Sequence, residues 1–80
     1  MAAGTRLSEA EAEYEEVVRL QPTNVMAHLN VGVMQARQGR FDSALGQFVE
    51  VLRLDPANQL AREYSARVQS WKNQNRTNMR

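Results

Sequence analysis

The stretch GRFDSALGQFVEVLRLDPAN, residues 39–58, has a partial copy of itself in TRLSEAEAEYEEVVRLQPTN, residues 5–24. In this alignment Tyr14 matches Phe48, Val17 matches Val51 and Pro22 matches Pro56. The offset of about 34 residues is typical of helix pairs that stack into a solenoid, in which each pair exposes an apolar face that its neighbour covers. The sequence therefore predicts an all-α fold.

Apolar residues recur at three- and four-residue intervals in four segments, which is the pattern of amphipathic helices. The predicted helices span about residues 7–20, 25–38, 41–54 and 58–73, with boundaries set by turn residues. The loops between them are short, so consecutive helices are expected to pack antiparallel. Residues 1–6 and 74–80 have little to bury and are expected to be flexible ends, the second of them basic.

The turn residues explain where these helices end. Pro22 and Pro56 stop the first and third helices, because proline cannot continue a helix. Gly39 ends the second helix, since glycine tolerates the left-handed conformation of a tight helix end. Asn24 and Asn58 are suited to cap the helices that follow them.

Composition restricts the class of protein. The chain has 80 residues, a net charge of +1 and no cysteine, so it forms one small domain without disulfides or thiolate metal sites. It has neither an apolar run long enough to cross a bilayer nor the apolar core of a secretory signal at its start. We therefore expect a soluble, cytoplasmic protein with no membrane contact.

Charge is distributed unevenly along the chain. The first 20 residues carry a net charge of −3, and the residues from Leu60 onward carry +4. One interpretation is that both terminal helices have ordinary solvated outer faces. The alternative is self-association of head-to-tail or swapped copies, steered by the opposite charges.

The residues of the repeat resemble the tetratricopeptide repeat family. Its pattern of glycine, turn glycine, alanine, aromatic residue and closing proline is matched in order by Gly32, Gly39, Ala44, Phe48 and Pro56. The resemblance covers one hairpin at about residues 25–58, half of a preceding unit and one following helix. It implies a right-handed solenoid of antiparallel helix hairpins with four helices.

The sequence also departs from the family pattern. His28 replaces the usual tryptophan, Gln35 the usual tyrosine, and Thr5 the turn glycine of the first unit.

The resemblance also implies a function. The family binds protein or peptide segments in a concave groove lined by the first helix of each hairpin, without a cofactor. The residues implied for partner binding are Met26, Leu29, Asn30, Val33, Arg37, Leu60, Tyr64 and Arg67. Asn30 matches one residue of the clamp that some members use for chaperone tails, but Leu60 and Tyr64 replace its basic residues, so that ligand is not expected.

Self-association is the second functional hypothesis. No helix that could pair with the segment starting at Leu7 is visible before it, so the first unit is expected to have an open apolar flank. A partner, or a second copy in a homo-oligomer, would cover that flank through Tyr14, Val17 and Trp71. Whether the chain is part of a longer array or a short self-completing protein stays open.

Catalytic and metal-binding chemistry is not indicated. His28 is the only histidine and has no orienting acid near it in sequence, so a packing role is expected. Glu9, Glu13 and Glu16 share a helix face but lack the ligand spacing of a calcium loop. The sequence therefore predicts neither an enzyme nor a metalloprotein.

Nucleic-acid binding is a remote alternative. Arg62, Arg67, Lys72 and Arg76 surround Trp71 in the sequence and could combine charge with a stacking ring. A soluble outer face on a capping helix explains the same residues more simply. Gly32 and Gly46 lie inside predicted helices, where glycine is expected to permit close helix approach.

Overall fold

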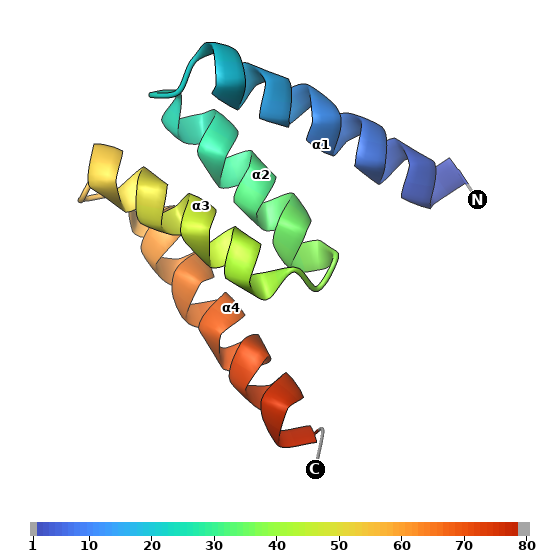
Figure 1. Cartoon of the computed structure of the whole chain (residues 1–80). Coiled ribbons are helices and arrows are strands. Elements are labelled where there is room, and N and C mark those ends of the chain that lie inside the picture. Colours follow the sequence, from blue (N-terminus) through green and yellow to red (C-terminus); the bar gives the residue numbers. More distant parts are fainter. Residues whose placement is uncertain (1, 79–80) are drawn as a thin grey trace.

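The computed structural model describes the backbone of residues 2–78 and the side chains of residues 9–74. It contains four helices, α1 Ala2–Leu20, α2 Val25–Arg37, α3 Phe41–Leu54 and α4 Gln59–Asn78. The described residues form no strand, and consecutive helices run in opposite directions (Figure 1). The predicted all-α architecture of helix hairpins is confirmed.

The terminal helices are longer than the apolar spacing predicts. α1 begins at Ala2 instead of Leu7, and α4 continues to Asn78 instead of ending at residue 73. Residues 2–6 and 74–78 are thus helical and lie beyond the predicted bounds of the terminal helices, while the flexibility of these ends stays a prediction. No proline interrupts either segment, so the helical backbone can continue beyond the predicted bounds. The remaining positions, 1, 79 and 80, lie outside the described residues.

The helix ends use the expected turn residues. The side-chain oxygen of Asn24 accepts a hydrogen bond from the Ala27 amide at 2.9 Å, and Asn58 does the same for Ala61 at 2.9 Å. Each asparagine satisfies an amide that has no partner within its own helix. Gly39 has a φ of +80°, a left-handed conformation that lets the chain reverse between α2 and α3.

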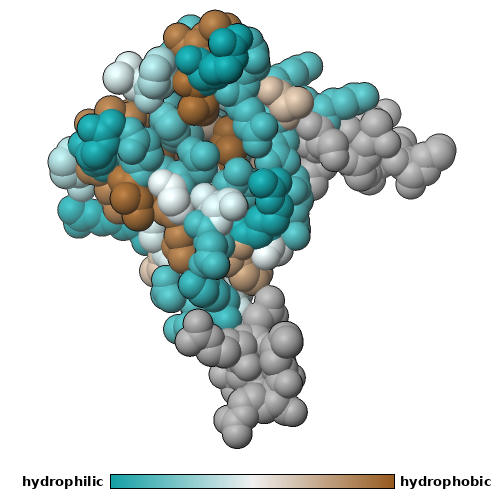
Figure 2. Space-filling model, viewed as in Figure 1, coloured by the Kyte–Doolittle hydropathy of each residue, from teal (hydrophilic) through white to brown (hydrophobic). Residues whose placement is uncertain are grey.

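The helices form a flat slab with extents of 41 × 37 × 15 Å. In this slab α2 packs against α1, α3 and α4, and α3 also packs against α4. The core lies where α2, α3 and α4 meet, and its buried members are Leu29, Ala44, Phe48, Val51, Ala61 and Val68. On the face viewed in Figure 2, hydrophobic residues show as separate patches among hydrophilic ones.

Glycine allows α2 and α3 to approach closely at one point. A Cβ atom added to Gly32 would lie 2.6 Å from Cε1 of Phe48, a side chain that is completely buried. The expected role of Gly32 in close packing therefore agrees with the geometry. Gly46 has no such role, because nothing lies within 4 Å of an added Cβ atom on the exposed side of α3.

Candidate partner-binding groove

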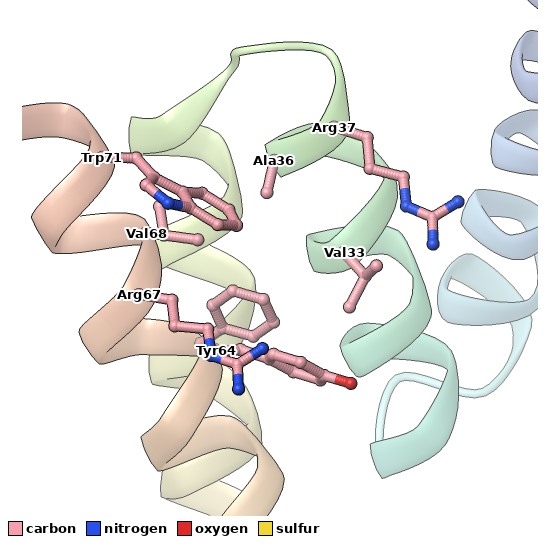
Figure 3. Close-up of a pocket in the computed structure, with 8 residues that line it drawn as sticks. Val33, Ala36, Arg37, Tyr64, Arg67, Val68 and Trp71 are labelled. Atoms are coloured by element: carbon pink, nitrogen blue, oxygen red, sulfur yellow. The ribbon is translucent and has the colours of Figure 1, made fainter. Parts of the chain in front are cut away.

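A pocket of about 270 Å³ opens between α2 and α4 (Figure 3). We call it the α2/α4 pocket; its lining residues are Val33, Ala36, Arg37, Phe48, Tyr64, Arg67, Val68 and Trp71. Pockets that enclose drug-sized ligands measure roughly 300–1,000 Å³. This one is smaller, so it suits one or two apolar side chains of a larger partner.

Aromatic rings build the walls of the α2/α4 pocket. The ring centroids of Phe48 and Tyr64 lie 5.9 Å apart, and those of Phe41 and Trp71 lie 6.4 Å apart. Both pairs are tilted, at separations that aromatic rings favour. Phe48 is buried, whereas Trp71 remains 46% exposed. The pocket therefore has a fixed apolar base and an accessible aromatic edge.

Two arginines flank this apolar surface. Arg67 extends from α4 with its guanidinium beside Tyr64, and Arg37 extends from α2 away from Trp71, towards α1 (Figure 3). Neither has a carboxylate or hydrogen-bond partner among the described side chains. Both side chains are exposed to solvent. Positive charge therefore lies on both sides of Val33, the residue between them.

Four of the residues predicted for partner binding line the α2/α4 pocket, namely Val33, Arg37, Tyr64 and Arg67. The same pocket includes Trp71, which the sequence assigned to self-association. Met26 and Leu60 are exposed and Asn30 is half-buried, but none of these three lines the pocket. The structure thus brings together residues from α2 and α4 that are far apart in the sequence.

The structure corrects the prediction for Leu29. Its side chain is only 3% exposed and belongs to the core, so the prediction that it contacts a partner is wrong. In the repeat alignment Leu29 corresponds to Glu63, which is exposed on α4. The flank of α2 that carries Leu29 is covered by α3, and an apolar residue is therefore favoured there over glutamate.

The flank of α1 is covered less well than the matching flank of α3. Phe48 and Val51 are completely buried, whereas their repeat counterparts Tyr14 and Val17 are half-buried. The difference arises because α2 covers this side of α3, whereas no described helix covers the corresponding side of α1. Tyr14 and Val17 therefore present apolar surface to solvent.

Glu11 is an organising residue that the sequence reasoning missed. It is buried, accepts a hydrogen bond from the side-chain amide of Gln38, and accepts another from Arg40 at 3.1 Å. The Gln38 hydrogen bond lowers the pKa of Glu11, burial opposes this, and Arg40 lowers the pKa further. A hydrogen bond with Glu11 raises the pKa of Glu15.

A sequence signal for Glu11 does exist. It takes the place of Leu45 in the repeat alignment and so interrupts an apolar stripe. Its contacts tie α1 to the turn between α2 and α3.

His28 is held inside the fold. Its Nε2 lies 2.8 Å from the carbonyl oxygen of Pro22, and its Nδ1 lies 2.8 Å from the side-chain oxygen Oε1 of Gln47. The Pro22 carbonyl oxygen accepts the hydrogen bond that Nε2 donates. The ring therefore links α2 to the preceding turn and to α3, as a packing role requires.

The side chains considered for metal or nucleic-acid binding are either exposed without forming a metal site or already bound to another group of the protein. Glu9, Glu13 and Glu16 are exposed, and the described residues contain no group of three or more side chains able to hold a metal. The Arg62 guanidinium donates to the Pro56 carbonyl, and Lys72 forms an ion pair with Asp42. The side chain of Arg76 lies outside the described residues.

Among the described residues, no helix has the length and apolarity that are needed to cross a membrane. No curated protein matches the chain closely enough to count as a relative. The family model described as "Tetratricopeptide repeat" matches residues 2–59, which is more than half of the chain. Repeats of this kind generally mediate protein–protein interaction as modules without enzymatic activity. With its matching hairpins and turns, the chain belongs to the tetratricopeptide repeat family.

Proposed function

We propose that this protein is an interaction module that binds a segment of a partner protein in the α2/α4 pocket. The observation that carries the proposal is the convergence of Val33 from α2 with Tyr64 and Trp71 from α4 around one apolar cavity. Exposed aromatic residues beside apolar cavities are common anchors of protein interfaces. A single apolar side chain of the partner would fill the cavity while its backbone follows α2 and α4.

The test begins with a display library of random 12-residue peptides selected on the immobilised 80-residue chain. Selected peptides are then labelled and titrated with the protein, with fluorescence polarisation as the readout. The informative variant is Val33→Glu, which places a charge in the pocket. The control is Val49→Glu, the same substitution at a valine of α3 that is 65% exposed and outside the pocket.

The proposal predicts that Val33→Glu weakens binding at least tenfold while Val49→Glu leaves it unchanged. Circular dichroism establishes that each variant is folded, because Val33 is half-buried. Trp71→Ala provides a second variant at a more exposed position of the same pocket. Binding that survives both Val33→Glu and Trp71→Ala would show that the segment binds elsewhere.

Self-association through α1 is a second candidate, favoured by the half-burial of Tyr14 and Val17 where their counterparts are fully buried. A second copy of the chain would cover this flank. The corresponding free flank of α4 is polar, with Gln59, Arg62, Glu63 and Ala66 around a shallow depression. We therefore propose that copies of the chain associate through the α1 flank, and that Trp71 belongs to the α2/α4 pocket and not to the interface between copies.

Size-exclusion chromatography with light scattering tests this second candidate over a range of protein concentrations. A dimer that Val17→Glu converts to a monomer, and that the control Val49→Glu leaves intact, supports self-association. A monomer at every concentration contradicts it and leaves the pocket proposal unaffected.

A further inference from the structure

The cationic side chains of the described residues divide into two groups. Most are engaged: Arg19 pairs with Glu16, Arg40 with Glu11, Arg53 with Glu50 and Lys72 with Asp42, while Arg62 donates to the Pro56 carbonyl. Arg37 and Arg67 have no such partner among these side chains, and both line the α2/α4 pocket. Within residues 9–74, the arginines without a partner therefore both lie at the α2/α4 pocket.

The pocket itself supplies no compensating negative charge. None of its eight lining residues has a carboxylate. Five are aliphatic residues, phenylalanine or tryptophan, two are the arginines, and Tyr64 adds one hydroxyl group. A guanidinium can donate two parallel hydrogen bonds to one carboxylate, so each arginine is suited to hold an aspartate or glutamate. Beside an apolar cavity such a contact is partly shielded from water, which strengthens it.

We propose that the α2/α4 pocket selects an acidic amphipathic segment, in which an apolar side chain enters the cavity and neighbouring carboxylates contact Arg67 and Arg37. This inference rests on the proposed function and specifies the chemistry of its partner. Arg67 turns towards Tyr64 and Arg37 turns towards α1 (Figure 3), so the two arginines contact carboxylates on opposite sides of the inserted side chain.

Three synthetic peptides test this chemistry. Each has about 15 residues, the length at which an isolated helix becomes marginally stable, and carries leucine at every third or fourth position. The peptides differ only in their flanking residues, which are glutamate, glutamine or lysine. They contain no aromatic residue, so the fluorescence of Trp71, the single tryptophan of the chain, reports occupation of the pocket.

The glutamate peptide is expected to bind about tenfold more tightly than the glutamine peptide, and the lysine peptide more weakly than either. Raising the salt concentration should reduce the difference between the glutamate and glutamine peptides. Arg67→Gln should weaken binding of the glutamate peptide about threefold without changing that of the glutamine peptide. Arg53→Gln changes the net charge equally at an arginine outside the pocket and should have little effect.

The outcomes separate the inference from the function it rests on. Equal binding of the glutamate and glutamine peptides, or preference for lysine, overturns the acidic selection but leaves a functioning apolar pocket. An equal effect of Arg53→Gln and Arg67→Gln also overturns it, because net charge alone then explains the preference. If none of the three peptides binds and the display library yields no ligand, both proposals fail.

Discussion

Replacing Gly32 with alanine tests the contact that sets the spacing of α2 and α3. The added Cβ would lie 2.6, 3.0 and 3.1 Å from three carbon atoms of the Phe48 ring. Carbon atoms in favourable contact are about 3.5–4.0 Å apart, so the ring or the helix must retreat by nearly 1 Å. Phe48 is completely buried, so a shift of its ring disturbs the core residues packed around it.

The magnitude follows from two opposing effects. Overpacking of a buried site costs about 1–3 kcal/mol. Alanine gains about 1 kcal/mol over glycine inside a helix. We therefore expect Gly32→Ala to lower the free energy of unfolding by about 1 kcal/mol.

Gly46→Ala is the matched control, because a Cβ added to Gly46 meets nothing within 4 Å. It gains the helix-propensity effect without overpacking and should raise the free energy of unfolding by about 0.5–1 kcal/mol. The difference between the two variants then measures the overpacking of Phe48 directly, about 2 kcal/mol or roughly 10 °C in melting temperature.

The assay is thermal and urea unfolding of both variants, followed by circular dichroism. Opposite shifts for the two substitutions are expected. Phe48→Leu should cost less in the Gly32→Ala background than in the wild type, because leucine relieves the overlap. If Gly32→Ala stabilises the protein as much as Gly46→Ala, the close packing of Gly32 against Phe48 is refuted.

Three further predictions concern helix capping, pH and core polarity. Asn58→Ala removes the cap of the Ala61 amide and should cost about 1 kcal/mol in urea unfolding; an unchanged midpoint would exclude the cap. Glu11→Gln should destabilise by about 1 kcal/mol at neutral pH. Because the pKa of Glu11 is lowered by folding, this difference should shrink as pH falls below about 4.3 in melting experiments, and a constant difference would contradict it. Among the described residues the buried side-chain oxygen of Gln35 has no hydrogen-bond partner. Gln35→Leu should therefore raise the melting temperature, with a gain of about 1 kcal/mol in the free energy of unfolding, whereas a loss of stability would contradict the absence of a hydrogen bond.

The fold was predictable because its signals are local. Pro56 and Gly39 mark helix ends through backbone geometry alone, and Phe48 takes its place in the apolar stripe of α3. The ends of α1 and α4 were less accessible to this reasoning. Both helices extend beyond the apolar pattern of the sequence, to Ala2 and to Asn78, and apolar spacing does not report helical residues outside that pattern.

The candidate site was predictable only in part, because burial depends on which neighbour covers each helix face. Val33 and Leu29 lie one turn apart on α2, yet Val33 lines the pocket and Leu29 is in the core. Both are aliphatic, so periodicity does not distinguish them. The repeat alignment did hold a signal for the burial of Leu29, because its counterpart is Glu63. Leucine lies on the flank of α2 that α3 covers, whereas glutamate lies on an exposed flank of α4.

The position of Trp71 could not be derived from the repeat pattern, because its counterpart in the alignment is Arg37. Its ring approaches Phe41 of α3 and completes the pocket only after α4 packs across α2 and α3. The unpaired state of Arg67 is likewise a property of the assembled fold, since it depends on where every nearby carboxylate lies.

The most direct measurement of the proposed interaction is a nuclear magnetic resonance titration of the isotopically labelled chain with a peptide selected from the display library. The account predicts shifts concentrated on α2 and α4 around Val33, Tyr64 and the Trp71 indole, with little change at Val49 on α3. Shifts confined to α1 or to the surface around Val49, with the Trp71 indole unmoved, would contradict it.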